Sequence, residues 1–119
     1  MTYVKINGTT YHATFNGKIA DPDWDNRESK AITTDELTYA EALALFVDDT
    51  DWSIVERNTV PVYDEKTGEP TGETKEIVNE YVNSDFSVAG DLTDHRDGRI
   101  TIKMGKPTDL ELAYEELYG

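Results

Sequence analysis

Apolar and polar residues alternate most regularly between residues 99 and 104. The even positions of this stretch are Ile, Ile and Met, whereas the odd positions are Arg, Thr and Lys. Because successive side chains of a strand point to opposite faces, this period of two predicts a strand with one buried face. Tyr11, Ala13 and Phe15 follow the same period and predict a second strand of this kind.

Turn residues divide the chain into further short strands. Asn7-Gly8 predicts a β-hairpin turn, and a second Asn-Gly at residues 16–17 predicts the end of the strand that follows it. Three more short strands are expected near residues 30–33, 52–55 and 86–89.

A long hairpin is expected over residues 60–82, with arms at 60–63 and 77–82. The residues between the arms, 64–76, read "DEKTGEPTGETKE" and include no apolar side chain. Such a segment buries no apolar area that would offset its ordering entropy. We therefore predict that residues 64–76 form a mobile hairpin tip.

Two capping boxes predict two short helices, at about 38–48 and 108–118. In each, a threonine is followed three residues later by a glutamate, as in Thr38 with Glu41 and Thr108 with Glu111. The threonine hydroxyl can accept from the glutamate backbone N–H while the carboxylate accepts from the threonine N–H. The predicted fold is therefore α+β: one domain over residues 1–119, with a mostly antiparallel sheet of about six or seven strands and a helix packed on one face.

The chain is strongly acidic, with 25 acidic and 11 basic residues and a formal net charge of −14. The excess is present in both halves of the sequence, so it belongs to the folded surface and not to a tail. Such a field repels nucleic acid and anionic membranes and favours basic partners, although it also serves solubility. We expect neither direct nucleic-acid binding nor membrane binding.

Cysteine is absent, which excludes disulfides, thiol catalysis and cysteine-ligated zinc. No stretch approaches the about 20 apolar residues of a membrane span, and the N-terminus has no apolar run of signal-peptide length. The expected location is the cytoplasm.

The stretch "DPDWDNRESK" at residues 21–30 admits three interpretations: a metal loop, a ligand-binding loop or a solvated connection. Its three aspartates match the first ligand positions of a calcium loop. The pattern fails at Asn26, where a glycine is needed, and at Ile32, where a bidentate glutamate is needed. We therefore predict no metal site.

Catalytic machinery is not evident in the sequence. The two histidines, His12 and His95, are the only side chains that titrate near neutral pH without perturbation. Neither lies near a serine in a nucleophile-elbow context, and no glycine-rich phosphate loop is present. The prediction is a non-enzymatic protein without a cofactor.

The few clustered bases of this acidic chain are candidates for ligand or partner contact. If the 21–30 loop and the turn near residue 97 share one sheet edge, they bring together an indole and several cationic groups. The indole could stack on a ring, and the cationic groups could bind a phosphate or carboxylate. The alternative is internal use, with Arg27 paired to a loop aspartate, Arg96 paired to Asp94, and the indole in the core. The predicted binding residues are Trp24, Arg27, Lys30, His95, Arg96 and Lys106.

Several segments also carry a resemblance to known sequences. "DWDNRESKAIT", "TYAEALALFVDDTDWSIVE", "NSDFSVAGDLTDHRDG" and "TIKMGKPTDLE" resemble small uncharacterised proteins of phages and prophages of gut Firmicutes, which lie near tail and lysis genes. The resemblance covers most of the chain outside residues 64–76. It implies a phage origin and carries over no catalytic or binding residue.

A phage origin favours two classes of non-enzymatic binding protein. The first is an inhibitor of a bacterial anti-phage defence system. It would sequester a nucleotide signal within a homo-oligomer, or block a nuclease as an acidic DNA mimic, as anti-CRISPR proteins do. Its partner would be a host defence protein or a nucleotide signalling molecule in the infected host's cytoplasm. The second class is a small accessory virion or tail structural protein. We take the first as the prediction and the second as the alternative.

Overall fold

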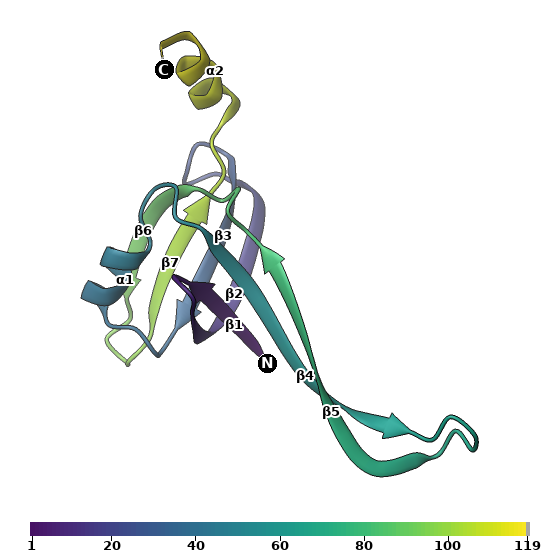
Figure 1. The fold of residues 1–119 in the computed structure, drawn as a ribbon. Helices are drawn as coiled ribbons and strands as arrows, with labels where there is room; N and C mark the ends of the chain where they lie inside the picture. Colours follow the sequence, from purple (N-terminus) through teal and green to yellow (C-terminus); the bar gives the residue numbers. More distant parts are fainter. Residues whose placement is uncertain (119) are drawn as a thin grey trace.

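The computed structural model describes residues 1–118, which form a seven-stranded antiparallel sheet and two short helices (Figure 1). The predicted α+β fold is confirmed. The strand order across the sheet is β5-β4-β1-β2-β3-β7-β6. In chain order the elements are β1 (Thr2–Ile6), β2 (Thr9–Asp21), β3 (Arg27–Thr34), α1 (Tyr39–Leu45), β4 (Trp52–Tyr63), β5 (Pro70–Val82), β6 (Val88–Asp94), β7 (Ile100–Gly105) and α2 (Asp109–Tyr118).

The core lies between one face of the sheet and helix α1. The alternation predicted for residues 99–104 is present, since the even positions of β7 are buried to within 3% exposure. Ala42 and Phe46 from the α1 segment belong to the same core, together with Trp52 at the start of β4. The buried Trp52 indole N–H donates to the Phe86 carbonyl oxygen at 3.1 Å, which satisfies the one polar atom of that side chain.

Two predicted boundaries are wrong. Strand β2 continues through residues 16–17, where Asn16 pairs with Ala31 and Gly17 with Lys30, so this Asn-Gly is not a turn. The chain reverses later, in the loop between Asp21 and Arg27. The strand expected at 86–89 begins at Val88 instead and runs to Asp94.

The β4–β5 hairpin extends beyond the rest of the sheet as an arm (Figure 1). Its inner part is flanked by β1, whose register with β4 ends where Thr2 pairs with Glu56. Beyond that pair the arm is two-stranded, which gives the molecule principal extents of 63 × 35 × 26 Å. Pairing continues to Tyr63 and Pro70, so residues 70–76, predicted within a mobile tip, continue strand β5. The mobility of the tip stays a prediction.

Helix α2 stands away from the sheet at the end opposite the arm (Figure 1). Its apolar side chains do not join the core: Leu110 is 81% exposed and Leu117 is 76% exposed. The helix begins as predicted, because the Thr108 hydroxyl accepts from the Glu111 N–H at 3.3 Å and the Glu111 carboxylate accepts from the Thr108 N–H at 3.0 Å. No helix within residues 1–118 is long and apolar enough to cross a membrane.

Candidate functional site

The 21–30 loop is organised by Asp21, whose side chain is fully buried. Its backbone oxygen accepts from the N–H groups of Trp24 and Asn26, at 3.1 and 2.8 Å. Its carboxylate accepts from the Asp23 N–H at 3.0 Å, and also from Ser29 on β3 and Lys103 on β7. The first aspartate of the calcium-like pattern therefore caps the loop from inside.

The Lys103 ammonium is the main cause of the lowered pKa of the Asp21 carboxyl. Its hydrogen bond to the Asp21 carboxylate, 3.0 Å from Nζ to Oδ2, holds the pKa of that carboxyl below its ordinary value of 3.8. Burial acts in the opposite direction, while the Asp23 N–H also lowers the pKa. The carboxylate is thus stabilised as the charged partner of a lysine.

The Trp24 indole lies against two glycines of the sheet, Gly90 in β6 and Gly105 at the end of β7. A Cβ atom added to Gly90 would lie 2.5 Å from the indole Cη2, and one added to Gly105 would lie 2.8 Å from Cζ3. The glycines therefore leave the room that the ring occupies. Trp24 is half-buried, so most of its stacking surface is used within the molecule.

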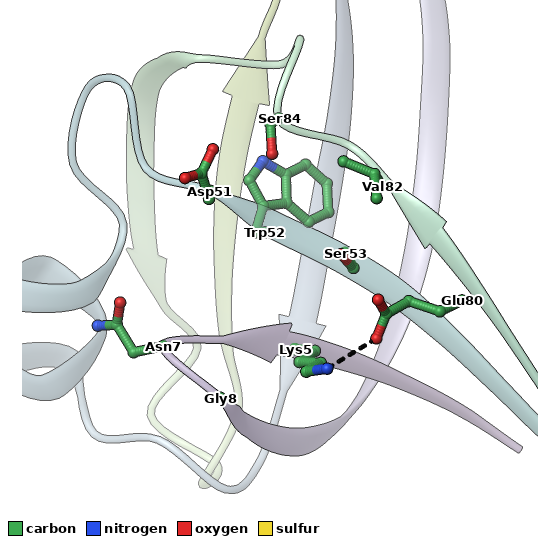
Figure 2. Close-up of a pocket in the computed structure, with 9 residues that line it drawn as sticks. All are labelled: Lys5, Asn7, Gly8, Asp51, Trp52, Ser53, Glu80, Val82 and Ser84. Atoms are coloured by element: carbon green, nitrogen blue, oxygen red, sulfur yellow. Dashed lines mark hydrogen bonds and ion pairs between the residues drawn. The ribbon is translucent and has the colours of Figure 1, made fainter.

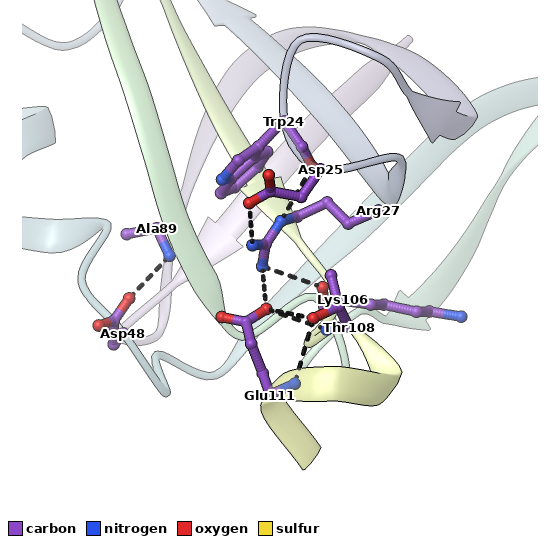
Figure 3. A network of polar contacts seen from close by, with 8 residues as sticks. All are labelled: Trp24, Asp25, Arg27, Asp48, Ala89, Lys106, Thr108 and Glu111. Carbon is purple, nitrogen blue, oxygen red and sulfur yellow. Dashed lines mark hydrogen bonds and ion pairs between the residues drawn. The ribbon is translucent and has the colours of Figure 1, made fainter. Parts of the chain in front are cut away.

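The Arg27 guanidinium lies over the ring of this indole (Figure 3). Its guanidinium carbon lies 4.6 Å from the ring centroid, and the residue is only 6% exposed. Nη1 lies 2.9 Å from a Glu111 carboxylate oxygen of α2, and Nη2 lies 3.6 Å from Asp25. The guanidinium also donates to the backbone oxygens of Trp24 and Lys106, each at 3.3 Å. Its donors therefore have partners within the chain.

Glu111 has two functions in this arrangement. The Thr108 backbone N–H is the main reason that the pKa of its carboxyl is lowered; burial opposes this, and Arg27 adds to it. The same oxygen that closes the capping box also pairs with Arg27. Sequence reasoning recognised the cap and missed the ion pair, because no local pattern links Glu111 to the loop.

Lys30 and Lys106 converge on the ring of Phe86. Their ammonium nitrogens lie 4.6 and 5.0 Å from the ring centroid, within the range of cation–π attraction. Lys30 donates to the Asn83 side-chain oxygen, while Lys106 pairs with Glu28 at 3.1 Å and Asp85 at 3.3 Å. The hydrogen bond to Glu28 is the main reason that the pKa of Lys106 is raised.

His95 and Arg96 lie at the other end of the sheet. Ser29 pairs with Gly105 at the loop end of β7, whereas Thr34 pairs with Ile100 beside the β6–β7 turn. Five residues of strand separate these ends, or about 17 Å. The structure thus brings Trp24, Arg27, Lys30 and Lys106 into one region but does not bring His95 and Arg96 to it. The two loops do not share one sheet edge, so the condition for a shared pocket is not met.

The contacts of the β6–β7 turn are local. The His95 ring lies 2.7 Å from the Thr101 hydroxyl, measured from Nε2 to Oγ1. Arg96 has a φ of 60° and donates its backbone N–H to the Asp94 carboxylate at 2.8 Å. The pairing of Arg96 with Asp94, which was the alternative to ligand binding, therefore exists as a turn hydrogen bond from the Arg96 backbone. Contact of these residues with a ligand or partner stays a prediction.

A shallow hollow of about 440 Å³, which sequence reasoning did not predict, lies above Trp52. Figure 2 shows the Lys5–Glu80 ion pair, 2.9 Å long, on one side of it and Asn7 and Asp51 on the other. Its one lysine is already paired with a glutamate. A smaller hollow of about 320 Å³ lies beside Arg27 and Lys106, whose charged groups are likewise partnered.

Within residues 1–118, no group of three or more histidine, aspartate and glutamate side chains is placed to hold a metal ion. Comparisons with protein-family models, with curated proteins and with solved structures found no match to this chain. The geometry itself is therefore the basis for a functional proposal.

Proposed function

We propose that the protein is a non-enzymatic, phage-encoded accessory component of a virion or tail that works through contacts with other protein chains. The observation that carries this proposal is the β4–β5 arm. Every residue of β5 is exposed, and Val78, Tyr81 and Val82 are between 51% and 71% exposed. Exposed apolar groups gathered on one edge strand are typical of an interaction surface.

The construction of the arm supports the same proposal. An isolated two-stranded hairpin is marginally stable in water, so the outer part of the arm gains little from its own pairing. The outer part of the arm would be stabilised where a neighbouring molecule covers it. Helix α2 adds a second uncovered apolar surface at the opposite end of the molecule, with Leu110 and Leu117 exposed.

The test is the composition of purified particles of a phage that encodes this chain. We expect the protein at a fixed copy number per particle by quantitative mass spectrometry. A variant in which Val78, Tyr81 and Val82 are all replaced by threonine should fold but should not enter particles. The matched control replaces residues 64–69 alone and should still enter. A protein present in the lysate but absent from particles would refute the proposal.

Inhibition of a defence system is the second candidate, and the charge distribution favours it. Asp21 is the only buried carboxylate side chain among residues 1–118, so nearly all of the acidic charge faces solvent. A DNA mimic presents such a surface to a basic nuclease. Its binding to that nuclease should weaken steeply as salt is raised, whereas salt-insensitive inhibition would count against mimicry. Nucleotide sequestration has less support, since the predicted aromatic and basic cluster is divided between two ends of the sheet.

A further inference from the structure

Strand β5 is an edge strand whose outward backbone groups can be identified. Asn83 donates its N–H to the Trp52 oxygen at 2.9 Å, in register with the pairing of Ser53 and Val82. Residues of an antiparallel strand alternate between bonding to one neighbour and to the other. The odd residues from Ile77 to Tyr81 therefore bond to β4. The N–H and C=O groups of the even residues from Glu76 to Val82 point to the free edge.

The opposite edge of the sheet, β6, is protected. Its register with β7 shifts between Ala89 and Leu92, which marks a bulge. The Ala89 N–H is already bonded to the Asp48 carboxylate at 2.8 Å (Figure 3). Bulges and charged residues are the devices by which natural sheets discourage edge pairing. The register of β5 with β4, in contrast, is continuous from Thr74 to Val82. A head-to-tail arrangement that needs both edges is therefore disfavoured, whereas pairing of β5 with β5 needs only the open one.

We propose that the free edge of β5 pairs antiparallel with β5 of a second copy of this chain, about a two-fold axis at Asn79. The proposal rests on the protein-contact function proposed above and names its surface. A two-fold axis perpendicular to the sheet places even-numbered residues opposite even-numbered ones and odd-numbered residues opposite odd-numbered ones. With the axis at Asn79, Ile77 of each copy lies opposite Tyr81 of the other. An aromatic side chain opposite a β-branched one is a favourable cross-strand pair.

The charges of β5 select among registers. With the axis at Asn79, Glu80 lies opposite Val78 and Glu76 lies opposite Val82, so no two like charges face each other. An axis at Val78 places Glu76 against Glu80, and an axis at Glu80 places that residue against itself. Glu80 is moreover paired with Lys5 of its own chain, 2.9 Å away. An axis at Ile77 also avoids like charges but places Tyr81 opposite Glu73, which leaves the aromatic ring without an apolar partner.

The dimer should be reversible and should respond to salt in a defined direction. A few rungs of strand pairing bury less than the about 1,600 Å² of a standard stable interface. Each copy carries a formal charge of −14, so approach is opposed by long-range repulsion. Raising salt from about 0.1 M to about 1 M shortens the screening length from about 10 Å to about 3 Å. In sedimentation velocity, the dimer fraction should therefore rise with both protein concentration and salt.

The absence of cysteine allows the register to be read from single-cysteine variants. In the proposed dimer the two Asn79 residues form a non-hydrogen-bonded pair with Cα atoms about 4.5 Å apart, within disulfide range. Asn79→Cys should therefore cross-link under mild oxidation. The two Ile77 residues would lie about 13 Å apart along the strands, which is too far for a disulfide. Ile77→Cys, the matched control, should cross-link at least about tenfold more slowly, as expected for random collision. Equal rates, or faster cross-linking of Ile77→Cys, would overturn the register.

A proline substitution tests the use of the backbone edge. Val78→Pro removes an outward N–H that β4 does not use, and proline is tolerated at such edge positions. This variant should keep the circular dichroism spectrum of the parent and lose the dimer, whereas Val78→Thr should keep both. A parent protein that stays monomeric at high concentration and high salt would overturn self-pairing, and dimerisation of Val78→Pro at the parental level would do the same. The particle-composition test of the proposed function is independent of either result.

Discussion

Replacing Arg27 by alanine should destabilise the protein by far more than the loss of a surface ion pair would. Three contributions are removed together. The guanidinium over the Trp24 ring accounts for about 0.5–2 kcal/mol. The ion pair with the half-exposed Glu111 adds about 0–1 kcal/mol. The aliphatic stem, whose Cδ lies 2.7 Å from the position that a Cβ on Gly105 would take, adds about 0.8 kcal/mol per buried methylene.

Together these contributions give a loss of about 3 kcal/mol in the free energy of unfolding, at the upper end of common single-residue effects. For a domain of this size the melting temperature should fall by about 12 °C. A stability of about 5–15 kcal/mol leaves the variant folded at room temperature. The assay is urea denaturation followed by circular dichroism and by fluorescence.

Arg99→Ala is the matched control. Arg99 also pairs with a carboxylate, 2.7 Å from Asp97, but its side chain is 58% exposed and covers no aromatic ring. Its loss should barely change the urea midpoint, because an exposed ion pair exchanges its contact for hydration. If Arg27→Ala and Arg99→Ala shift the midpoint equally little, the inference that the loop is braced by Arg27 is wrong, and its guanidinium is available for a ligand.

Three further predictions concern the packing and titration of the same fold. Gly90→Ala should cost about 1–3 kcal/mol, because the new methyl group would overlap an indole atom 2.5 Å away; Gly17→Ala, whose Cβ meets no atom closer than 3.9 Å, should leave the urea midpoint nearly unchanged. The lowered pKa of Asp21 contributes stability that is present above about pH 4 and lost as pH falls through the depressed folded value. Asp21→Asn should therefore flatten the acid limb of a stability-against-pH curve, and an unchanged acid limb would contradict this assignment. Replacing residues 64–69 with Asn-Gly should leave the melting temperature nearly unchanged, since loop length has only a small entropic effect; a large fall would show that the tip is packed.

The local patterns of the sequence predicted the elements that depend on local interactions. The Thr38 capping box is formed as expected, with bonds of 3.1 and 3.2 Å to Glu41. The period of two at residues 99–104 placed the buried face of β7 correctly. In both cases the determining contacts lie within a few residues of each other. Such contacts can be read from spacing alone.

The prediction failed where distant contacts outweigh a local preference. Asn16-Gly17 is a strong turn signal, yet Gly17 pairs with Lys30 inside a ladder that continues from the pairing of Phe15 with Ile32. The chain turns only where the buried Asp21 can bond to the loop and to Lys103, 82 residues away. Contacts over such separations leave no periodic trace in one sequence, which is also why the pairing of Arg27 with Glu111 was not foreseen.

The bases of this acidic chain show how clustered cations are used within the molecule. Seven of the eleven bases form an ion pair or lie over an aromatic ring within the molecule: Lys5, Arg27, Lys30, Arg57, Arg99, Lys103 and Lys106. Where acidic residues outnumber basic ones by more than two to one, most basic side chains have an interaction partner within the same chain. Cations gathered near an aromatic residue in such a sequence therefore indicate internal bracing first. Strand β5 differs from the region around the 21–30 loop, because the apolar side chains of β5 remain exposed. That difference is why we place contact with other chains on β5 and not on the 21–30 loop.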